Sequence, residues 1–347
     1  MIMFKGCGTA LATPMRADGS IDYEGLEQLV EFQIANNIQS VLAVGTTGES
    51  PTLLWEEHNE VIDRTVKLAK ERVQSIAGVG SNSTKETLAG SEHAAHVGAD
   101  AVLVVDPYYN GPSSMEIRRE YIEPVAKDFP QMQVLPYIIP GRTGCMMQVE
   151  DLAILAEQYP NVGQVKEATG DLENMAKTRR ICGDDFTIFS GDDDKTVAMM
   201  KDPNIKAAGV VSVMSNVIPG PLQKLTELLL AGQEAEADEL AAKLNPLFGM
   251  VGVTTTEESP HGPVECKSRN PVPVKTLMNI LGMPSGPCRQ PLGKMTRSGA
   301  AIVLAAAKQV QVNDPATFAP IAEFFGVDIE ARLNDDSLIE NLIYQSY

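Results

Sequence analysis

The strongest chemical signal in this sequence is one lysine inside a short apolar segment. Lys166 follows "VGQV" and precedes "EATG", in a stretch with the composition of a buried strand. Burial disfavours the charged form of an amine, so this lysine must either meet an anion or lose its proton. A neutral amine attacks a ketone to give an imine and then an enamine. The alternative is an ion pair with a neighbouring carboxylate such as Glu167.

A phenol and a guanidinium lie one apolar segment earlier. "YIIPGRTG" begins at Tyr137 and contains Arg142, on either side of a Pro-Gly turn. The phenol could move protons between an amine, a substrate carbon and water if another hydroxyl orients it, and Thr46, Thr47 or Tyr109 could do so. The guanidinium could bind a carboxylate through two hydrogen bonds, although an arginine in such a turn can also be a simple surface charge.

These residues follow short apolar runs that look like strands buried on both faces. Amphipathic segments lie between the runs, for example residues 22–35 and 56–69, and these segments predict helices. Eight strands that alternate with helices are typical of a (β/α)8 barrel. The runs comprise residues 8–14, 41–44, 75–79, 101–105, 134–139, 162–165, 186–189 and 207–213.

A doubly wound sheet would show the same alternation of strands and helices. It would normally carry a glycine-rich phosphate turn after the first strand, and "GTALATPMRADGS" has no G-x-G-x-x-G. We therefore expect a TIM barrel. In that fold the side chains at the carboxyl ends of the strands meet at one mouth, which is where catalysis takes place.

The strand pattern stops after about residue 232. Residues 233–250, 272–283 and 298–310 predict three helices beyond the barrel, and residues 315–325 and 335–347 predict two more in the tail. The polar stretch 252–270 is long for a loop, so we expect a surface flap or a partly disordered segment. The domains expected are a barrel (1–232), a C-terminal helical domain (233–310) and an extra helical tail (311–347).

The composition excludes several partners. A formal net charge of -18 would repel a nucleic-acid backbone, and no basic run offsets it. No run reaches the roughly 18 apolar residues that a membrane helix needs, and the first residues lack the pattern of a signal peptide. The five cysteines show no disulfide or metal-ligand spacing, so reduced and mostly buried thiols are expected. These features favour a cytoplasmic protein that binds neither nucleic acid nor membrane.

Seven motifs in order resemble the dihydrodipicolinate synthase / N-acetylneuraminate lyase family of pyruvate-dependent class I aldolases. They are "GTTGES", "PYYN", "YIIPGRTG", "KEATG", "SGDD", "GVVSV" and "NPVPVK", and the resemblance covers about residues 4–310. The double threonine and the arginine of "RTG" favour the synthase branch. The resemblance implies a lyase that condenses pyruvate with L-aspartate 4-semialdehyde on the lysine and diaminopimelate route.

The resemblance also assigns roles to individual residues. It implies that Lys166 forms the Schiff base with pyruvate and that Tyr137, Thr46 and Tyr109 relay protons, with Tyr109 supplied by a neighbouring subunit. Binding of the two substrates is expected from a further set: Thr47 for the pyruvate carboxylate, Arg142 for the carboxylate of the aldehyde, and Gly191 and Val211 lining the pocket.

Members of this family carry a lysine-binding inhibitory site at a dimer interface. Residues suited to lysine binding occupy these positions here, so L-lysine is expected as an inhibitor. The resemblance also implies that the protein assembles as a homotetramer, a dimer of dimers. His58 and Glu86 could instead be ordinary polar residues of helix surfaces, and Tyr108 could pack at an interface. The implied set is Ser50, Trp55, His58, Asn82, Glu86 and Tyr108.

Two residues depart from the family pattern, and both flank the expected catalytic tyrosine. Pro136 removes a backbone donor inside a strand, where proline is rarely tolerated. Ile138 replaces an asparagine that is usual in the synthases. An aldolase for another 2-keto acid or sugar acid therefore remains an alternative, as does a non-catalytic paralogue that binds a keto or amino acid.

The acidic run "SGDDD" after the seventh strand has two interpretations. A serine followed by acids at a helix start is how ordinary helices are capped, and we prefer this to a metal site. Schiff-base chemistry uses the amine of the protein as the electron sink, so neither a metal nor an organic cofactor is expected.

Overall fold

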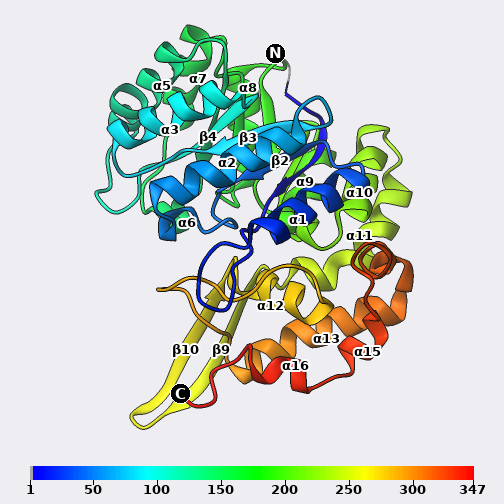
Figure 1. Ribbon diagram of the computed structural model, residues 1–347. Helices are drawn as coiled ribbons and strands as arrows, with labels where there is room; N and C mark the ends of the chain where they lie inside the picture. The colour runs from blue at the N-terminus through cyan, green and yellow to red at the C-terminus, as the bar shows by residue number, and fades with distance from the viewer. Residues whose placement is uncertain (1–2) are drawn as a thin grey trace.

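The computed structural model describes residues 3–347. Eight parallel strands form a closed barrel in the order in which they occur along the chain (Figure 1). The first strand pairs with the last from Gly6 opposite Gly209 to Thr9 opposite Ser212, which closes the barrel. The predicted TIM barrel is confirmed. Its strands are β1 (Gly6–Ala10), β2 (Ser40–Ala43), β3 (Gln74–Gly78), β4 (Ala101–Val105), β5 (Gln133–Ile138), β6 (Gln164–Glu167), β7 (Thr187–Ser190) and β8 (Gly209–Ser212).

Helices follow each strand and cover the outside of the barrel (Figure 1). Side-chain caps set several of their starts; for example, Asp22 accepts a hydrogen bond from the amide of Gly25 at the first turn of α1. The helices are α1 (Tyr23–Ala35), α2 (Trp55–Ala69), α3 (Thr84–Val97), α4 (Ser114–Glu116), α5 (Glu123–Asp128), α6 (Pro140–Thr143), α7 (Val149–Gln158), α8 (Leu172–Cys182), α9 (Thr196–Lys201) and α10 (Pro219–Leu230).

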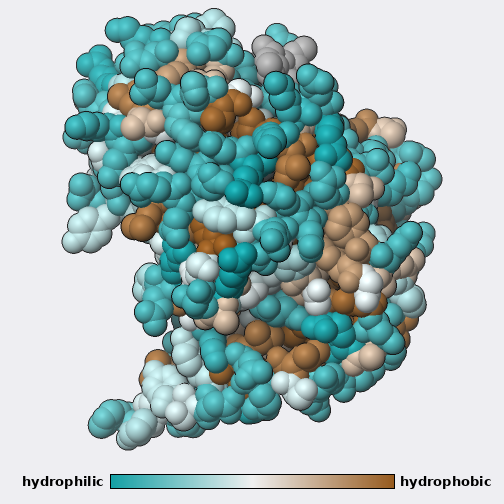
Figure 2. Space-filling model, in the orientation of Figure 1, coloured by the Kyte–Doolittle hydropathy of each residue, from teal (hydrophilic) through white to brown (hydrophobic). Residues whose placement is uncertain are grey.

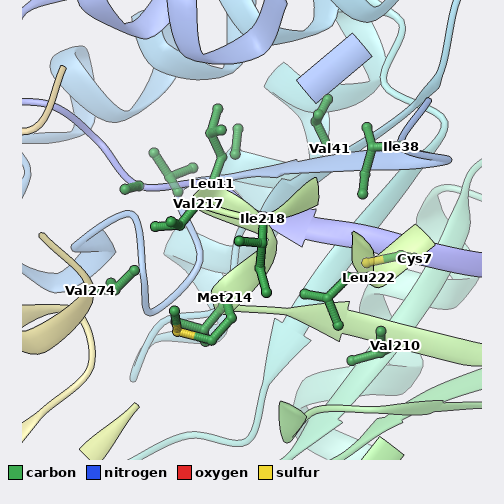
Figure 3. Packing of buried hydrophobic residues seen from close by; sticks show 14 of the residues in the cluster. Cys7, Leu11, Ile38, Val41, Val210, Met214, Val217, Ile218, Leu222 and Val274 are labelled. Atoms are coloured by element: carbon green, nitrogen blue, oxygen red, sulfur yellow. The ribbon is translucent and has the colours of Figure 1, made fainter. Parts of the chain in front are cut away.

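Two apolar clusters lie on opposite faces of the barrel wall. The inner cluster includes Tyr137 and Phe189, and the outer cluster includes Ile138 and Ile188. Successive residues of a strand point to opposite faces, which explains this division. Figure 3 shows part of the outer cluster, where strand residues such as Val210 pack against α10 through Leu222 and its neighbours. The barrel wall is therefore buried on both sides, as its near-continuous apolar strands indicated.

The three helices expected after the barrel are present as α11 (Glu234–Phe248), α12 (Val272–Leu281) and α13 (Arg297–Asn313). Of the two alternatives expected for residues 252–270, the partly disordered segment is wrong, and the surface flap is an ordered pair of strands. β9 (Gly252–Ser259) and β10 (Gly262–Arg269) pair as an antiparallel two-stranded sheet, here called the ribbon. It projects from the body, and its surface is mainly hydrophilic (Figures 1 and 2). Because most of its side chains lie in solvent, the ribbon lacks the apolar alternation that marks a half-buried strand.

The tail packs on the barrel of its own chain. It contains α14 (Ala319–Phe325), α15 (Ile329–Leu333), which was not predicted, and α16 (Ser337–Glu340), which is shorter than predicted. The ring of Phe325 lies 5.1 Å from that of Phe32 in α1. Arg332 donates to the carbonyls of Ile280 and Asn279 at 2.8 and 2.9 Å, which satisfies the end of α12. Two elements of the main body thus hold the tail.

Two expectations from the composition can be compared with the structure. All five cysteines are free, but only Cys7 is fully buried and the other four are half-buried, so the expectation of mostly buried thiols is wrong. Within residues 3–347, no helix is both long and apolar enough to cross a lipid bilayer.

Candidate active site

Lys166 and Tyr137 lie side by side inside the barrel. They are direct partners in the register of β5 with β6. The ammonium nitrogen Nζ of Lys166 lies 4.3 Å from the centroid of the Tyr137 ring, and each residue is only 4% exposed. The sequence places them one strand apart, and pairing of β5 with β6 in this register brings the amine and the phenol together at the inner face.

Burial lowers the pKa of Lys166 to about 8, while the charges of Asp192 and Asp193 act in the opposite direction. Within the described part of the chain, Lys166 forms no ion pair. The expected alternative partner, Glu167, points to the other face of the strand, where it accepts hydrogen bonds from the amide of Thr169 at 2.7 Å and from Asn174 at 3.2 Å. A pKa of about 8 leaves roughly a tenth of this amine neutral at pH 7.

The phenol of Tyr137 stays protonated at neutral pH. Burial raises its pKa to about 12, the charge of Arg142 lowers it, and a hydrogen bond with the side chain of Thr46 also lowers it. Thr46 is the hydroxyl that the sequence proposed for orienting the phenol. Tyr137 can therefore give a proton to a group bound above Lys166 and recover one through Thr46.

Pro136 and Ile138, the two residues that depart from the family pattern, lie on either side of Tyr137. They are placed differently from Tyr137 relative to Lys166. Ile138 belongs to the outer cluster, under the helices, so its side chain is on the opposite face of the strand. Pro136 pairs with Val104 of β4, and the register of β5 with β6 begins only at Tyr137. A residue without a backbone donor is therefore tolerated at the position just before the phenol.

The interpretation of the acidic run as a helix cap is wrong. The short helical turn Asp193–Lys195 has no side-chain cap. Instead the buried carboxylate of Asp193 accepts hydrogen bonds from the hydroxyl of Ser212 and from the amides of Val213 and Met214, the latter two at 3.0 and 3.1 Å. It therefore ties the end of β7 to the end of β8, close to Lys166.

Asp192 was missed by the sequence analysis as a member of this site. Its charge acts on Lys166, Tyr137 and Arg142 alike, and its own pKa is raised, first by burial and then by neighbouring acids. The only signal in the sequence was its place in an acidic run at a strand end. It is the acid whose charge most favours the protonated form of Lys166.

The two residues expected to bind carboxylates are joined by a third. Thr47 is buried and its hydroxyl accepts a hydrogen bond of 3.0 Å from the side-chain amide of Asn270. Arg142 lies at the rim and donates to the backbone carbonyl of Asn270 at 3.1 Å. Asn270 begins the "NPVPVK" motif, but the sequence analysis gave it no role.

Gly191 and Val211 lie against the same inner space. A Cβ atom at Gly191 would lie 2.7 Å from the Cβ of Ala168 and 3.2 Å from the Cε of Lys166, so a larger residue would press on the lysine. Val211 is fully buried in the inner cluster. Gly191 is therefore a neighbour of Lys166, and Val211 belongs to the same inner face of the barrel.

A cavity of about 210 Å³ opens beside Tyr137, and Lys166, Gly191 and Val211 are not among its lining residues. It runs from Thr46, Tyr137 and Arg142 outward to Ser50 and Tyr108, with Lys166 beneath the tyrosine ring. Its size suits a small molecule. It thus joins the inner site to part of the residue set expected to bind lysine.

That second set is only partly assembled within one chain. His58 is buried, its ring lies 4.7 Å from that of Trp55, and its Nε2 lies 3.2 Å from the hydroxyl of Ser50. Burial lowers the pKa of His58 to about 4, so it is neutral, and it is not a helix-surface residue. Glu86 and Asn82 are exposed.

Tyr109 stands apart from the site of its own chain. It is 92% exposed and has a φ of 85°, a left-handed conformation that costs energy for a residue with a Cβ. Its neighbour Tyr108 is half-buried, and the pKa of that phenol is raised by burial and by the charge of Glu86. Tyr109 therefore does not join the other two relay residues, Tyr137 and Thr46, beside Lys166 within this chain.

A second buried lysine lies outside the catalytic cluster. Lys275 is 1% exposed and donates to Glu49 at 2.6 Å, to the carbonyl of Thr13 at 3.0 Å and to that of Pro287 at 2.8 Å. Glu49 ends the "GTTGE" motif. The pair ties α12 to the loop that carries Thr46 and Thr47. No group of three or more possible metal ligands occurs among residues 3–347.

Comparison with known proteins gives one consistent result. The family model described as the dihydrodipicolinate synthetase family matches residues 3–310. Two relatives carry the name 4-hydroxy-tetrahydrodipicolinate synthase. The one from Methanococcus vannielii is 38% identical over 294 residues, 85% of this chain and 94% of its own. The one from Geotalea uraniireducens is 39% identical over 307 residues, 88% of this chain and 99% of its own.

Solved structures agree with the sequence comparison. A dihydrodipicolinate synthase from Cyanidioschyzon merolae, solved with lysine bound, has a TM-score of 0.80 and 33% identity, and the match covers 89% of this chain and 99% of that one. A monomeric dihydrodipicolinate synthase variant also has a TM-score of 0.80, with 31% identity and coverage of 89% and 97%.

Proposed function

The chain belongs to the dihydrodipicolinate synthetase family, and we propose that it condenses pyruvate with L-aspartate 4-semialdehyde to 4-hydroxy-tetrahydrodipicolinate. This lyase reaction would serve lysine and diaminopimelate biosynthesis in the cytoplasm. One observation carries the proposal: the buried amine of Lys166, which forms no ion pair within residues 3–347, lies against the protonated phenol of Tyr137, a residue that lines a small cavity.

The chemistry begins with the neutral amine of Lys166. It attacks the ketone carbon of pyruvate, and the resulting carbinolamine loses its hydroxyl as water after receiving a proton from Tyr137, which leaves an imine. Loss of a proton from C3 then gives an enamine. A C–C bond forms between this carbon and the aldehyde carbon, and the aldehyde oxygen takes a proton. The amino group of the condensed chain finally attacks the imine carbon, closes the ring and releases Lys166.

The two carboxylates are assigned to different elements of the site. The hydroxyl of Thr47, held by Asn270, and the loop around it would bind the carboxylate of pyruvate. Arg142 at the rim would bind the carboxylate of the aldehyde, for which its planar fork of donors is suited. Gly191 leaves the space beside Lys166 that the reacting carbon needs.

Tyr109 would complete the relay of another subunit in a homotetramer built from tight dimers. Its support is the exposure of an aromatic ring on a strained backbone at the end of β4. Mixing two inactive variants, Lys166→Ala and Tyr109→Phe, tests this sharing. Mixed dimers should regain activity, because one site then has both Lys166 and a Tyr109. Mixtures that stay inactive although mixed dimers form would contradict it.

Inhibition by L-lysine would use the outer end of the cavity, near Ser50, Trp55, His58 and Tyr108. The support is the cluster formed by Trp55, His58 and Ser50 and the presence of lysine in a solved structure of the same family. The carboxylate of Glu86 lies close enough for its charge to raise the pKa of Tyr108, and it could pair with an ammonium. Lysine should inhibit wild type and lose potency against Trp55→Ala, whereas equal inhibition of both would exclude this site.

Reduction with borohydride in the presence of pyruvate tests the central step. Mass spectrometry should find one adduct per chain, on Lys166, and an unmodified Lys166 in a folded protein would end the proposal. A coupled assay across aldehydes then tests the second substrate. L-aspartate 4-semialdehyde should give the highest kcat/KM, whereas a preference for a sugar-derived aldehyde would favour another member of the family.

A further inference from the structure

The end of the ribbon is joined to the rim of the cavity by a reciprocal pair of hydrogen bonds. Nη1 of Arg269, the last residue of β10, donates to the carbonyl of Gly141 at 2.9 Å. Nη2 of Arg142 donates back to the carbonyl of Asn270 at 3.1 Å. Residues 141–142 and 269–270 therefore each supply one guanidinium and one carbonyl, which fixes two segments that are 128 residues apart.

The same point of contact reaches deeper into the site. Asn270 is 5% exposed, and its side-chain amide donates to the hydroxyl of Thr47 at 3.0 Å. Its side-chain carbonyl oxygen Oδ1 is buried and has no hydrogen-bond partner among residues 3–347. The base of the ribbon thus contacts both groups assigned to substrate carboxylates, although the rest of the ribbon lies mostly in solvent.

Two positive charges are held together at this rim. Partial desolvation at the rim lowers the pKa of Arg142, whose side chain is still exposed, and the nearby charge of Arg269 lowers it further. Like charges at short range repel each other, and an anion between or beside them offsets this repulsion. Arg269 is exposed and has donors beyond the one used on Gly141, because a guanidinium carries five. In a protein of net charge -18, such a pair is a local site of attraction for a carboxylate.

We propose that Arg269 determines specificity for the aldehyde substrate: it positions Arg142 through the bond to Gly141 and adds a second guanidinium facing the aldehyde carboxylate. This inference rests on the proposed function, because it assigns Arg142 to that carboxylate. Pyruvate, which is bound at Thr47 and Lys166, does not depend on it. Changes at Arg269 should therefore affect recognition of the second substrate without affecting formation of the imine.

The test uses Arg269→Gln, Arg269→Lys and the matched control Lys267→Gln in the full chain. Lys267 lies on the same exposed face of β10, two residues earlier, and carries the same charge. Each variant is assayed with L-aspartate 4-semialdehyde and with propanal, an aldehyde that has no carboxylate. Pyruvate KM and borohydride trapping of pyruvate on Lys166 are measured in parallel.

Arg269→Gln should raise the KM for L-aspartate 4-semialdehyde about five- to tenfold, because one charge-assisted contact at a partly exposed site is lost. Its pyruvate KM, trapping and kcat/KM for propanal should stay within about twofold of wild type. Arg269→Lys should recover part of the loss, since it restores the charge but not the planar fork. Lys267→Gln should match wild type.

Several outcomes would overturn the inference. An unchanged KM for the semialdehyde in Arg269→Gln would remove Arg269 from recognition, and an equal rise in Lys267→Gln would reduce the effect to general charge. An equal loss with propanal would point to a merely structural role. Failure of the proposed function is distinguishable, because wild type itself would then show no trapping at Lys166 or no turnover of the semialdehyde.

Discussion

The protein buries two lysines, and they have opposite surroundings. Lys275 is surrounded by acceptors, namely the carboxylate of Glu49 and two backbone carbonyls. Lys166 is 4% exposed and forms no ion pair within residues 3–347, so burial lowers its pKa to about 8. The two lysine side chains are buried to nearly the same extent. The difference shows that partners, rather than burial alone, decide whether a buried lysine acts as a structural cation or as a nucleophile.

Their positions in the fold explain the difference. Lys275 lies where α12 meets the loop after β2, and its charge holds the two together. Lys166 lies on the inner wall of the barrel, where its neighbours are Tyr137 and Gly191. The carboxylates of Asp192 and Asp193 act on it only at longer range. A catalytic amine needs negative charge around it that only partly compensates its positive charge, because it must be able to lose its proton. A structural amine does not need this.

The largest expected effect comes from removing the reactive lysine. Lys166→Ala should lower kcat by at least about 10⁴-fold, because no other group can form the imine. Lys166→Arg should be equally inactive, since a guanidinium stays protonated. Steady-state kinetics measures both, with circular dichroism as the check on folding. Residual activity above a hundredth of wild type would mean that the chemistry lies elsewhere.

Lys166 lies beside a phenol, that of Tyr137, whereas Lys275 is surrounded by a carboxylate and two backbone carbonyls. Removing this phenol should have the next largest effect. Tyr137→Phe keeps the ring against Lys166 but removes the proton donor, so kcat should fall about 10²- to 10⁴-fold. Trapping of pyruvate by borohydride should become slower but should still occur on Lys166. Full activity of Tyr137→Phe would show that water, and not the phenol, moves the proton.

Breaking the paired lysine should affect stability rather than chemistry. Lys275→Met leaves the carboxylate of Glu49 buried without its cation, so the free energy of unfolding should fall by about 3–5 kcal/mol. Urea unfolding measures this, with Lys267→Met on the exposed ribbon as the control, which should stay within about 0.5 kcal/mol of wild type. The double variant Glu49→Gln, Lys275→Met should recover part of the loss. A single variant as stable as the control would show that the pair does not stabilise the fold.

The smallest effect is a shift along the pH axis. Exchange of the C3 hydrogens of pyruvate for deuterium needs the neutral amine, so its rate should rise with pH through a midpoint near 8. The carboxylate of Asp192 favours the ammonium, so Asp192→Asn should move this midpoint to lower pH. Asp194→Asn, at the exposed neighbouring acid, is the control and should leave the midpoint in place. A shift to higher pH would reverse the assigned role of Asp192.

The same pKa has a consequence for stability. The folded pKa of Lys166 is about 8, below its ordinary value of 10.5, so between these values the unfolded chain binds more protons. The contribution of this lysine to the free energy of unfolding therefore increases as the pH rises through that window.

Some features of the fold could be predicted from the sequence, and others could not. The eight strands were predicted correctly because each is an apolar run that is buried on both sides. The ribbon was missed because its exposed strands carry no apolar alternation. The helix cap predicted for the run "SGDDD" was wrong because the partners of Asp193 lie about 20 residues away. Glu49 and Lys275 are 226 residues apart, so no local pattern could have paired them.

The sequence by itself determined the barrel, the strand that carries Lys166 and the phenol one strand away. It could do so because strand and helix periodicity are local properties of the chain. The tertiary structure decided which buried lysine is paired, which face Ile138 and Glu167 take, and that Arg269 meets Arg142. The faces follow from strand register, and the other outcomes depend on distances between charges, which exist only after the barrel has closed and the C-terminal part has packed against its mouth.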